Sequence, residues 1–216
     1  MPEDIPPRSP LNRELILRTA VAIADEGGLE AVSMRALAGE LGVTAMSLYN
    51  HVANKAEMID GMIDLVIAEI ELPEGTDWKS AIRTSSRSTR EVLLRHRWAA
   101  GLWLSRQGGV GPARLRHGDW LLGQLRQSGL PMELVFHAYH ILESYILGSA
   151  LQQLSFPFQG EELAGIAQNF LQEFPLDDYP EFVEHVRQHL DPPEGSGFEF
   201  ALDLILDSLD RAREPA

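Results

Sequence analysis

The sequence SMRALAGELGVTAMSLYNHVANK, residues 33–55, decides the fold of this protein. Ser33 and Thr44 are preferred N-cap residues, so we expect a short helix after each of them. Gly42 lies between the two helices, where a tight turn needs a left-handed backbone. Ala38 is small enough to let the helices cross closely, and Leu48 faces inward. Two short helices at this spacing predict a helix-turn-helix, whose second helix enters the DNA major groove.

The same stretch supplies side chains that suit DNA. Small or hydroxyl groups in the first turn of the second helix allow close approach, so methyl groups there contact thymine and Ser47 hydrogen-bonds to most bases. Basic and phenolic groups suit guanine or phosphate. From the residues alone, the candidates are Arg35, Ala45, Met46, Ser47, Tyr49 and Lys55. A second interpretation stays open at this point, because many helical domains contain such a glycine turn without binding DNA.

The chain on either side of this stretch also reads as helical. Asn12 caps a helix that runs to about Glu26, and Asn54 with Glu57 resembles a capping box that opens a helix through about Glu71. Helical periodicity continues over 78–95, 97–107, 112–128, 132–153, 161–173, 180–189 and 198–212. We therefore predict an all-α fold, with an N-terminal three-helix helix-turn-helix DNA-binding domain and a larger helical effector and dimerisation domain. The expected boundaries are a disordered arm at 1–10, the DNA-binding domain at 11–58, a connecting helix at 59–75 and the second domain at 76–216.

Composition limits the possible classes of protein. The net charge of −14 and the pI of about 4.8 oppose phosphate binding, so DNA binding must come from a local patch and should be sensitive to salt. With no cysteine there is no disulfide and no thiolate metal site. No apolar run is long enough for a membrane span, and the start lacks the pattern of a signal peptide. We expect a cytoplasmic protein that does not bind a membrane.

The stretch LGVTAMSLYNHVANK, followed by an apolar helix, resembles the DNA-binding domain of the tetracycline-repressor (TetR) family. WKSAIRTSSRSTREVLLRHR, GLPMELVFHAYHILESYILGSALQQ and GFEFALDLILDSLD are similar to the effector domain of the tetracycline-repressor branch, so the resemblance covers most of the chain. It implies a repressor that binds an operator and is released by a small molecule. It implies DNA contacts from Ser33, Arg35, Thr44, Ala45, Met46, Ser47, Tyr49, His51 and Lys55. Ala45 departs from the pattern because it lacks an amide, so the operator sequence should differ.

A homodimer is expected for two reasons. One short recognition helix reads few base pairs, so two-fold symmetry is needed. The resemblance also implies that two effector-domain helices pair with their copies in a four-helix bundle. The segment 132–153 is apolar on all sides, which indicates burial on more than one side. A monomer core is the alternative explanation, and we favour the dimer. The candidate interface residues are Tyr145, Gly148, Gln152, Leu202, Ile205, Leu206 and Leu209.

A ligand cavity is expected in the second domain. Phe136, His140 and Glu143 have i, i+4, i+7 spacing, and ionisable groups in an apolar helix need polar partners. Tyr139 and Ser144 lie at the margins of that face. The full set of candidate ligand-binding residues is Trp103, Trp120, Phe136, Tyr139, His140, Glu143 and Ser144. The alternative is a helix-surface His–Glu pair with the tryptophans in the core.

The chemistry of the expected ligand follows from one difference between this sequence and the tetracycline repressor. Trp103 stands where the tetracycline repressor has a magnesium-binding histidine, so a tetracycline–magnesium inducer is not expected. An aromatic or apolar small molecule with a polar group suits the sequence better.

Two other classes of protein remain as alternatives. His140 and Glu143 could serve as acid and base in an all-helical enzyme or small-molecule-binding protein without DNA binding, but no nucleophile elbow, phosphate loop or dinucleotide fingerprint is present. A helical adaptor that binds only protein is the other. His185 and His189 have i, i+4 spacing but lack the H-E-x-x-H order, so we interpret them as a surface face. We predict no catalytic residue, cofactor or metal site.

Overall fold

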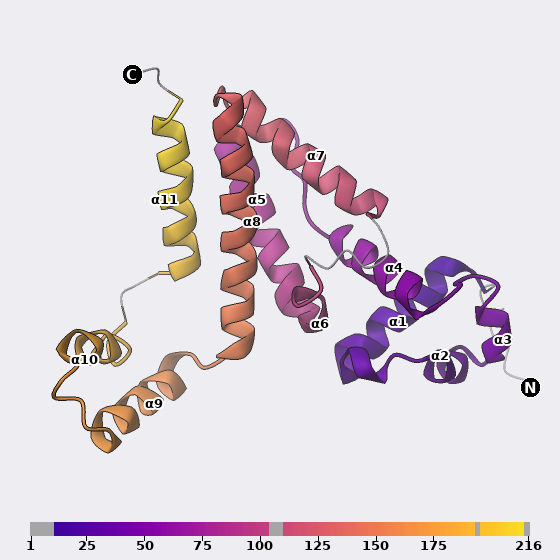
Figure 1. Cartoon of the computed structure of the whole chain (residues 1–216), viewed down its shortest axis with the longest axis horizontal. Helices are drawn as coiled ribbons and strands as arrows, with labels where there is room; N and C mark the ends of the chain where they lie inside the picture. The colour runs from indigo at the N-terminus through magenta and orange to yellow at the C-terminus, as the bar shows by residue number, and fades with distance from the viewer. Residues whose placement is uncertain (1–10, 104–109, 193–194, 214–216) are drawn as a thin grey trace, which may run out of the picture. The chain divides into compact units, whose positions relative to one another are not determined.

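The structure is a computed structural model that describes residues 11–103, 110–192 and 195–213. Within those ranges every regular element is a helix and there is no strand, which confirms the all-α prediction (Figure 1). None of the described helices is both long and apolar enough to cross a membrane. The arm predicted at 1–10 lies outside the described residues.

The first helix, α1 (Arg13–Gly27), is the centre of the N-terminal helices. The side chain of Asn12 accepts a hydrogen bond from the Leu15 amide and caps it. At the other end Gly28 has a φ of 75°, which lets the chain turn into a short 3-10 turn, η1 (Leu29–Ala31). One side of α1 is buried, formed by Ile16, Leu17, Ala20, Val21 and Ala24.

The helix-turn-helix is formed by α2 (Met34–Leu41) and α3 (Ala45–Leu48). Ser33 and Thr44 cap these helices through hydrogen bonds to the amides of Ala36 and Ser47. Gly42 has a φ of 64° and a ψ of 36°, so the turn between the helices is left-handed. Glycine takes this conformation without the steric cost that a Cβ would add.

Helix α4 (Lys55–Ile67) follows and packs against α1. Asn54 caps it through the Glu57 amide, and the Glu57 carboxylate accepts a hydrogen bond from the Ala53 amide. The helix ends earlier than the predicted Glu71. Tertiary contacts hold the residues beyond its end, because Glu69 forms an ion pair with Arg95.

Four helices make up the next part of the chain: α5 (Trp78–Arg95), α6 (Arg97–Ala100), α7 (Pro112–Gln127) and α8 (Met132–Ser155). Helix α6 is shorter than the predicted 97–107, and residues 104–109 lie outside the described residues. Pro112 occupies the first turn of α7, where its missing amide hydrogen costs nothing. Helix α7 packs against both α4 and α5.

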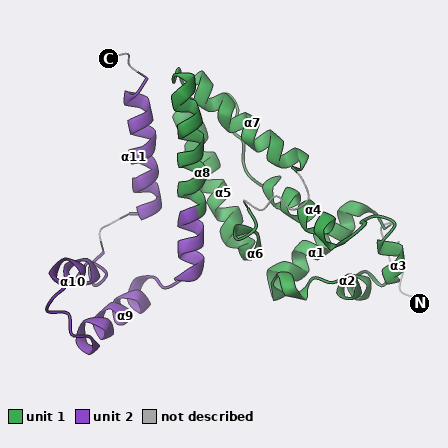
Figure 2. Ribbon diagram, in the orientation of Figure 1, with its two compact units in different colours: residues 1–147 green, residues 148–216 purple. Residues whose placement is uncertain are grey.

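The chain divides into two compact units, residues 1–147 and 148–216 (Figure 2). The predicted boundaries near residues 58 and 75 stay predictions. Within the first unit, α4 packs on α1 and on α7 and so joins the helix-turn-helix to the first effector helices.

The second unit contains the end of α8, then α9 (Gly160–Glu173), α10 (Pro180–Arg187) and α11 (Gly197–Arg211). Helices α9 and α10 pack through aromatic rings. The Phe170 ring stacks on that of Phe174 with 4.7 Å between centroids, and it meets the edge of Phe182 at 5.9 Å.

Candidate DNA-binding face and effector pocket

The packing of the helix-turn-helix separates a buried side from an exposed side. Leu37 and Leu48 are fully buried, while Met46 is 76% exposed and Tyr49 is 50% exposed. The Val43 amide donates a hydrogen bond to the Ala38 carbonyl, which ties the turn to the end of α2. Since the apolar positions of α2 and α3 point into the core, the opposite side of the same helices is left for a partner.

All nine predicted DNA contacts lie on the segment from the cap of α2 to the first residue of α4. Those that are exposed are Ser33, Arg35, Thr44, Met46, Tyr49 and Lys55; those that are half-buried are Ala45, Ser47 and His51. Arg35 and Lys55 have no ion-pair partner within the described part of the chain. The Ser47 hydroxyl donates to the Thr44 carbonyl at 2.6 Å, so it must turn away from that bond to reach a base.

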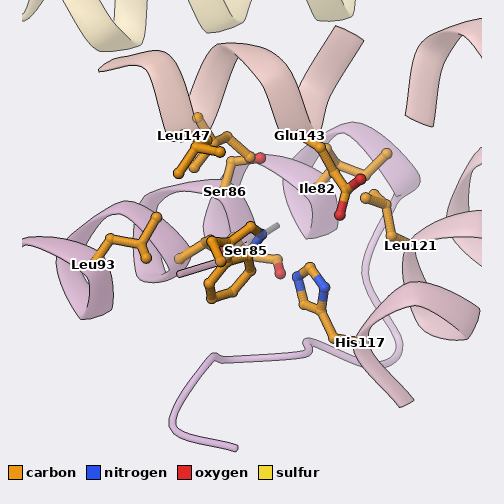
Figure 3. A pocket seen from close by; sticks show the side chains of 11 residues that line it. Ile82, Ser85, Ser86, Leu93, His117, Leu121, Glu143 and Leu147 are labelled. Carbon is orange, nitrogen blue, oxygen red and sulfur yellow. The ribbon is translucent and has the colours of Figure 1, made fainter. Parts of the chain in front are cut away.

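A small pocket lies between α5, α7 and the part of α8 that belongs to the first unit (Figure 3). Its volume is about 20 Å³, enough for roughly one water molecule. Helix α5 contributes hydroxyl groups, and apolar side chains form the rest of the wall. The lining residues are Ile82, Ser85, Ser86, Thr89, Leu93, Trp103, His117, Leu121, Glu143, Ile146 and Leu147.

The polar centre of this pocket is formed by His117 and Glu143, whose side chains point toward one another from α7 and α8 (Figure 3). Burial of His117, with a smaller contribution from the positive charge of Arg114, lowers the pKa of the imidazole from 6.5 to about 4. The ring is therefore neutral near pH 7. Its edge-to-face contact with Trp103 has 6.3 Å between centroids. Among the described residues no group forms a hydrogen bond with either ring nitrogen. The Tyr139 hydroxyl donates to the Glu143 carboxylate at 3.0 Å.

The structure brings only some of the predicted ligand-binding residues together. Trp103 and Glu143 line the pocket, and Tyr139 reaches it through Glu143. Trp120 is half-buried and donates its indole N–H to the Pro73 carbonyl at 3.3 Å, away from the lining.

Three other predicted ligand-binding residues do not line the pocket, namely Phe136, His140 and Ser144. They lie on the exposed side of α8, where Phe136 is 60% exposed and its ring meets that of His140 at 4.7 Å. The side of α8 that turns inward carries Val135, Ala138, Leu142 and Ile146. Because α8 is apolar on all sides, hydrophobic periodicity could not identify its inward side.

Sequence reasoning missed His117 and the hydroxyl residues of α5. The sequence did carry a signal, since Ser85, Ser86 and Thr89 follow i, i+1, i+4 spacing and so lie on one side of a helix. The structure buries all three. Buried hydroxyl groups on one helix side usually face polar partners or a cavity.

The predicted dimer residues also divide by exposure. Leu202 and Leu206 are fully buried in the protomer, so they have no surface to offer to a second copy. Gly148 and Gln152 are exposed, and Tyr145, Ile205 and Leu209 are half-buried. On α11 the exposed apolar residues are Phe200 at 68% and Leu204 at 53%. The dimer interface itself stays a prediction, and on α11 the apolar surface available to a second copy is that of Phe200 and Leu204.

Two family models match the chain. The model described as bacterial regulatory proteins, tetR family, matches residues 16–62, and the tetracyclin repressor-like C-terminal domain matches residues 72–212. The HTH-type transcriptional repressor DrrR1 of Streptomyces coeruleorubidus is 30% identical over 216 residues, an alignment that covers 94% of this chain and 79% of that protein. Tetracycline repressor protein class D of Escherichia coli is 31% identical over 150 residues, 66% of each chain.

Solved structures are similar over nearly the whole chain. Apo ActR of Streptomyces coelicolor has a TM-score of 0.78 and 31% identity, covering 95% of this chain and 97% of that one. Its complex with actinorhodin has a TM-score of 0.76 and 30% identity, covering 96% and 100%. The matching relatives are transcriptional regulators and not enzymes. The chain therefore belongs to the TetR family, and it is a ligand-responsive DNA-binding transcriptional repressor with an effector domain of the tetracycline-repressor type.

Proposed function

We propose that the protein binds a palindromic operator as a homodimer, through the exposed side of α2, α3 and the start of α4. The observation that carries this proposal is the division of that segment into buried leucines and an exposed side with two cations, Arg35 and Lys55, that pair with no described carboxylate. Such cations bind phosphate by displacing counterions. Met46, at 76% exposed, contributes an apolar contact to a base edge.

Selection of binding sites from a random DNA duplex pool, at two salt concentrations, tests this proposal. We expect an inverted repeat with half-sites about one helical turn apart, because a two-fold dimer presents two recognition helices. The net charge of −14 repels DNA outside the patch, so the affinity should fall steeply with salt. Arg35→Ala should weaken operator binding, while Arg126→Ala, which removes an exposed cation of α7, serves as the matched control. Failure to recover any motif at low salt would contradict the proposed DNA-binding face.

We further propose that the effector is a small aromatic or apolar molecule that carries a hydrogen-bond donor and binds between α5, α7 and α8. The neutral imidazole of His117, which no described residue hydrogen-bonds, and the Glu143 carboxylate both accept hydrogen bonds, and a hydroxyl or amine of the effector supplies the donor. The surrounding wall of Ile82, Leu93 and Leu121 suits an apolar body. ActR was solved with actinorhodin, which supports an effector site in a closely similar fold.

The pocket must enlarge to accept such a molecule. Its present volume is about 20 Å³, whereas ligand sites usually measure about 300–1,000 Å³. Opening of the pocket therefore has to separate α7 from α5 or α8. Effector binding would thus move helices that also pack against other parts of the protein.

Trp103 in the pocket wall provides a direct measurement of effector binding. We expect phenolic aromatic compounds to quench tryptophan fluorescence at saturable concentrations, and Glu143→Gln to weaken binding by about tenfold, because a charge-assisted hydrogen bond contributes about 1.5–3 kcal/mol. Ser144→Ala, on the exposed side of the same helix, is the matched control and should leave binding unchanged. Equal effects of both substitutions would place the effector elsewhere.

A further inference from the structure

Helix α4 packs on effector helices and is bonded to one of them, α7, through the Asp64 side chain. It begins at Lys55, a proposed DNA contact, and carries Asp64 near its other end. Helix α4 packs on α1 on one side and on α7 on the other (Figure 1). Any displacement of the effector helices that reaches the DNA-binding face along this path must pass through a contact of α4.

The Asp64 carboxylate caps helix α7 from outside that helix. One carboxylate oxygen, Oδ1, accepts hydrogen bonds from the amides of Ala113 at 2.9 Å and Arg114 at 3.2 Å. These are among the first amides of α7, which have no partner within the helix. The N-cap residue of α7 itself is Gly111, which has no side chain that could accept hydrogen bonds from these amides. The negative charge is also favourable at the positive end of the helix dipole.

Gly111 shows how closely the two segments approach. A Cβ atom at this position would overlap the Asp64 carboxylate. Only glycine leaves room for the hydrogen bonds of Asp64, so the sequence of α7 accommodates a residue of α4. The contact is therefore specific in geometry and does not depend on flexible surface side chains.

Helix α7 also carries His117, the imidazole of the pocket. His117 lies one helical turn after Ala113, on the same helix. A helix moves as a nearly rigid rod over one turn because its backbone hydrogen bonds are continuous. A group that pushes His117 outward therefore displaces the amides that hold Asp64.

A second polar contact joins the same parts of the chain but does not involve α7. His96, which follows α5, has Nδ1 at 2.8 Å from Asp25 of α1 and Nε2 at 3.2 Å from Glu69. The Trp98 indole N–H donates to Asp25 at 2.8 Å. This cluster ties α1 and Glu69, which lies beyond the end of α4, to the junction of α5 and α6, and it supplies a matched control.

We propose that Asp64 is the coupling residue of this repressor: its hydrogen bonds to the start of α7 transmit the opening of the effector pocket to α4 and so to the DNA-binding face. The proposal rests on the pocket and the DNA-binding face described under Proposed function. Removal of the Asp64 side chain should leave a protein that binds DNA with an affinity that no longer changes when the pocket is filled.

A double-mutant cycle tests this without an identified effector. Ser85→Leu fills the pocket from α5, and Leu121→Phe is a second filling variant from α7. In the parent chain we expect each to weaken operator binding about tenfold, within the usual range of about 5–150-fold for allosteric coupling. In the Asp64→Ala background the loss should fall to twofold or less. Gly111→Ala breaks the same contact from the α7 side, so in this background the filling variants should also lose most of their effect on operator affinity.

The control background is Trp98→Phe, which removes the hydrogen bond between α6 and α1 and does not touch α7. There the filling variants should keep their full effect. An equal loss of affinity in the Asp64→Ala and parent backgrounds would overturn the proposal. So would uncoupling by Trp98→Phe of the same size as that by Asp64→Ala.

Hydrogen exchange of the α4 peptide 55–67 gives a second reading that needs no DNA. Ser85→Leu should raise exchange there in the parent chain and not in the Asp64→Ala background. If neither the parent protein nor any variant bound the selected DNA, the proposed DNA-binding function would fail, but the exchange experiment would still test the coupling between the pocket and α4. If Ser85→Leu left the exchange of the 55–67 peptide unchanged in the folded parent chain, the proposed coupling through Asp64 would be overturned.

Discussion

Acidification from about pH 7 to pH 4 should lower the free energy of unfolding by about 3 kcal/mol through His117 alone. The cause is burial, which lowers the pKa of this imidazole from 6.5 in the unfolded chain to about 4 in the folded one. Between these two values the unfolded state binds a proton that the folded state does not. The contribution of His117 to the free energy of unfolding is therefore fully present above pH 6.5 and is lost as the pH falls toward 4.

Urea denaturation of the parent protein and of His117→Gln, measured across this pH range, checks the prediction. The glutamine keeps a polar side chain but does not titrate, so the variant should lose the His117 part of the pH dependence. His140→Gln removes an exposed imidazole of α8 and is the matched control. A pH dependence that survived in His117→Gln would show that other groups cause it.

Leu48→Ala should abolish operator binding by loosening the recognition helix. Leu48 is fully buried, and removal of a buried leucine usually costs about 2–5 kcal/mol. Helix α3 is a single turn, Ala45–Leu48, so its position depends on this anchor far more than on its own hydrogen bonds. Fluorescence anisotropy with the selected operator, together with thermal denaturation, measures both effects.

Met46→Ala is the control for this prediction. Met46 is 76% exposed on the same helix, so its removal should change stability by no more than about 0.5 kcal/mol. Its effect should appear in the base preference of the selected site. If Leu48→Ala bound the operator as tightly as the parent, α3 would not be the recognition helix.

The helices near the N-terminus were predictable because their signals are local. Each of Asn12, Ser33, Thr44 and Asn54 caps the helix that follows it, as its side-chain chemistry predicts. Gly42 has the left-handed conformation that the turn requires. These choices depend on neighbours a few residues away, so they can be read directly from the sequence.

The inward side of α8 was not predictable in the same way. Apolar side chains surround this helix, and both Phe136 and Ala138 are compatible with burial. The structure buries Ala138 and leaves Phe136 exposed. Hydrophobic periodicity distinguishes sides only when one of them is polar, so the predicted ligand-binding residues of α8 divided between the pocket and the surface.

The sequence by itself determined the helical class, the helix-turn-helix and the family, because caps, turn glycines and motif spacing act over short distances along the chain. Only the tertiary structure placed His117 opposite Glu143 and Asp64 at the start of α7. Those pairs are separated by tens of residues, and no periodic pattern links them. Their meeting depends on how whole helices pack, since burial of one side of each helix sets which distant side chains come into contact.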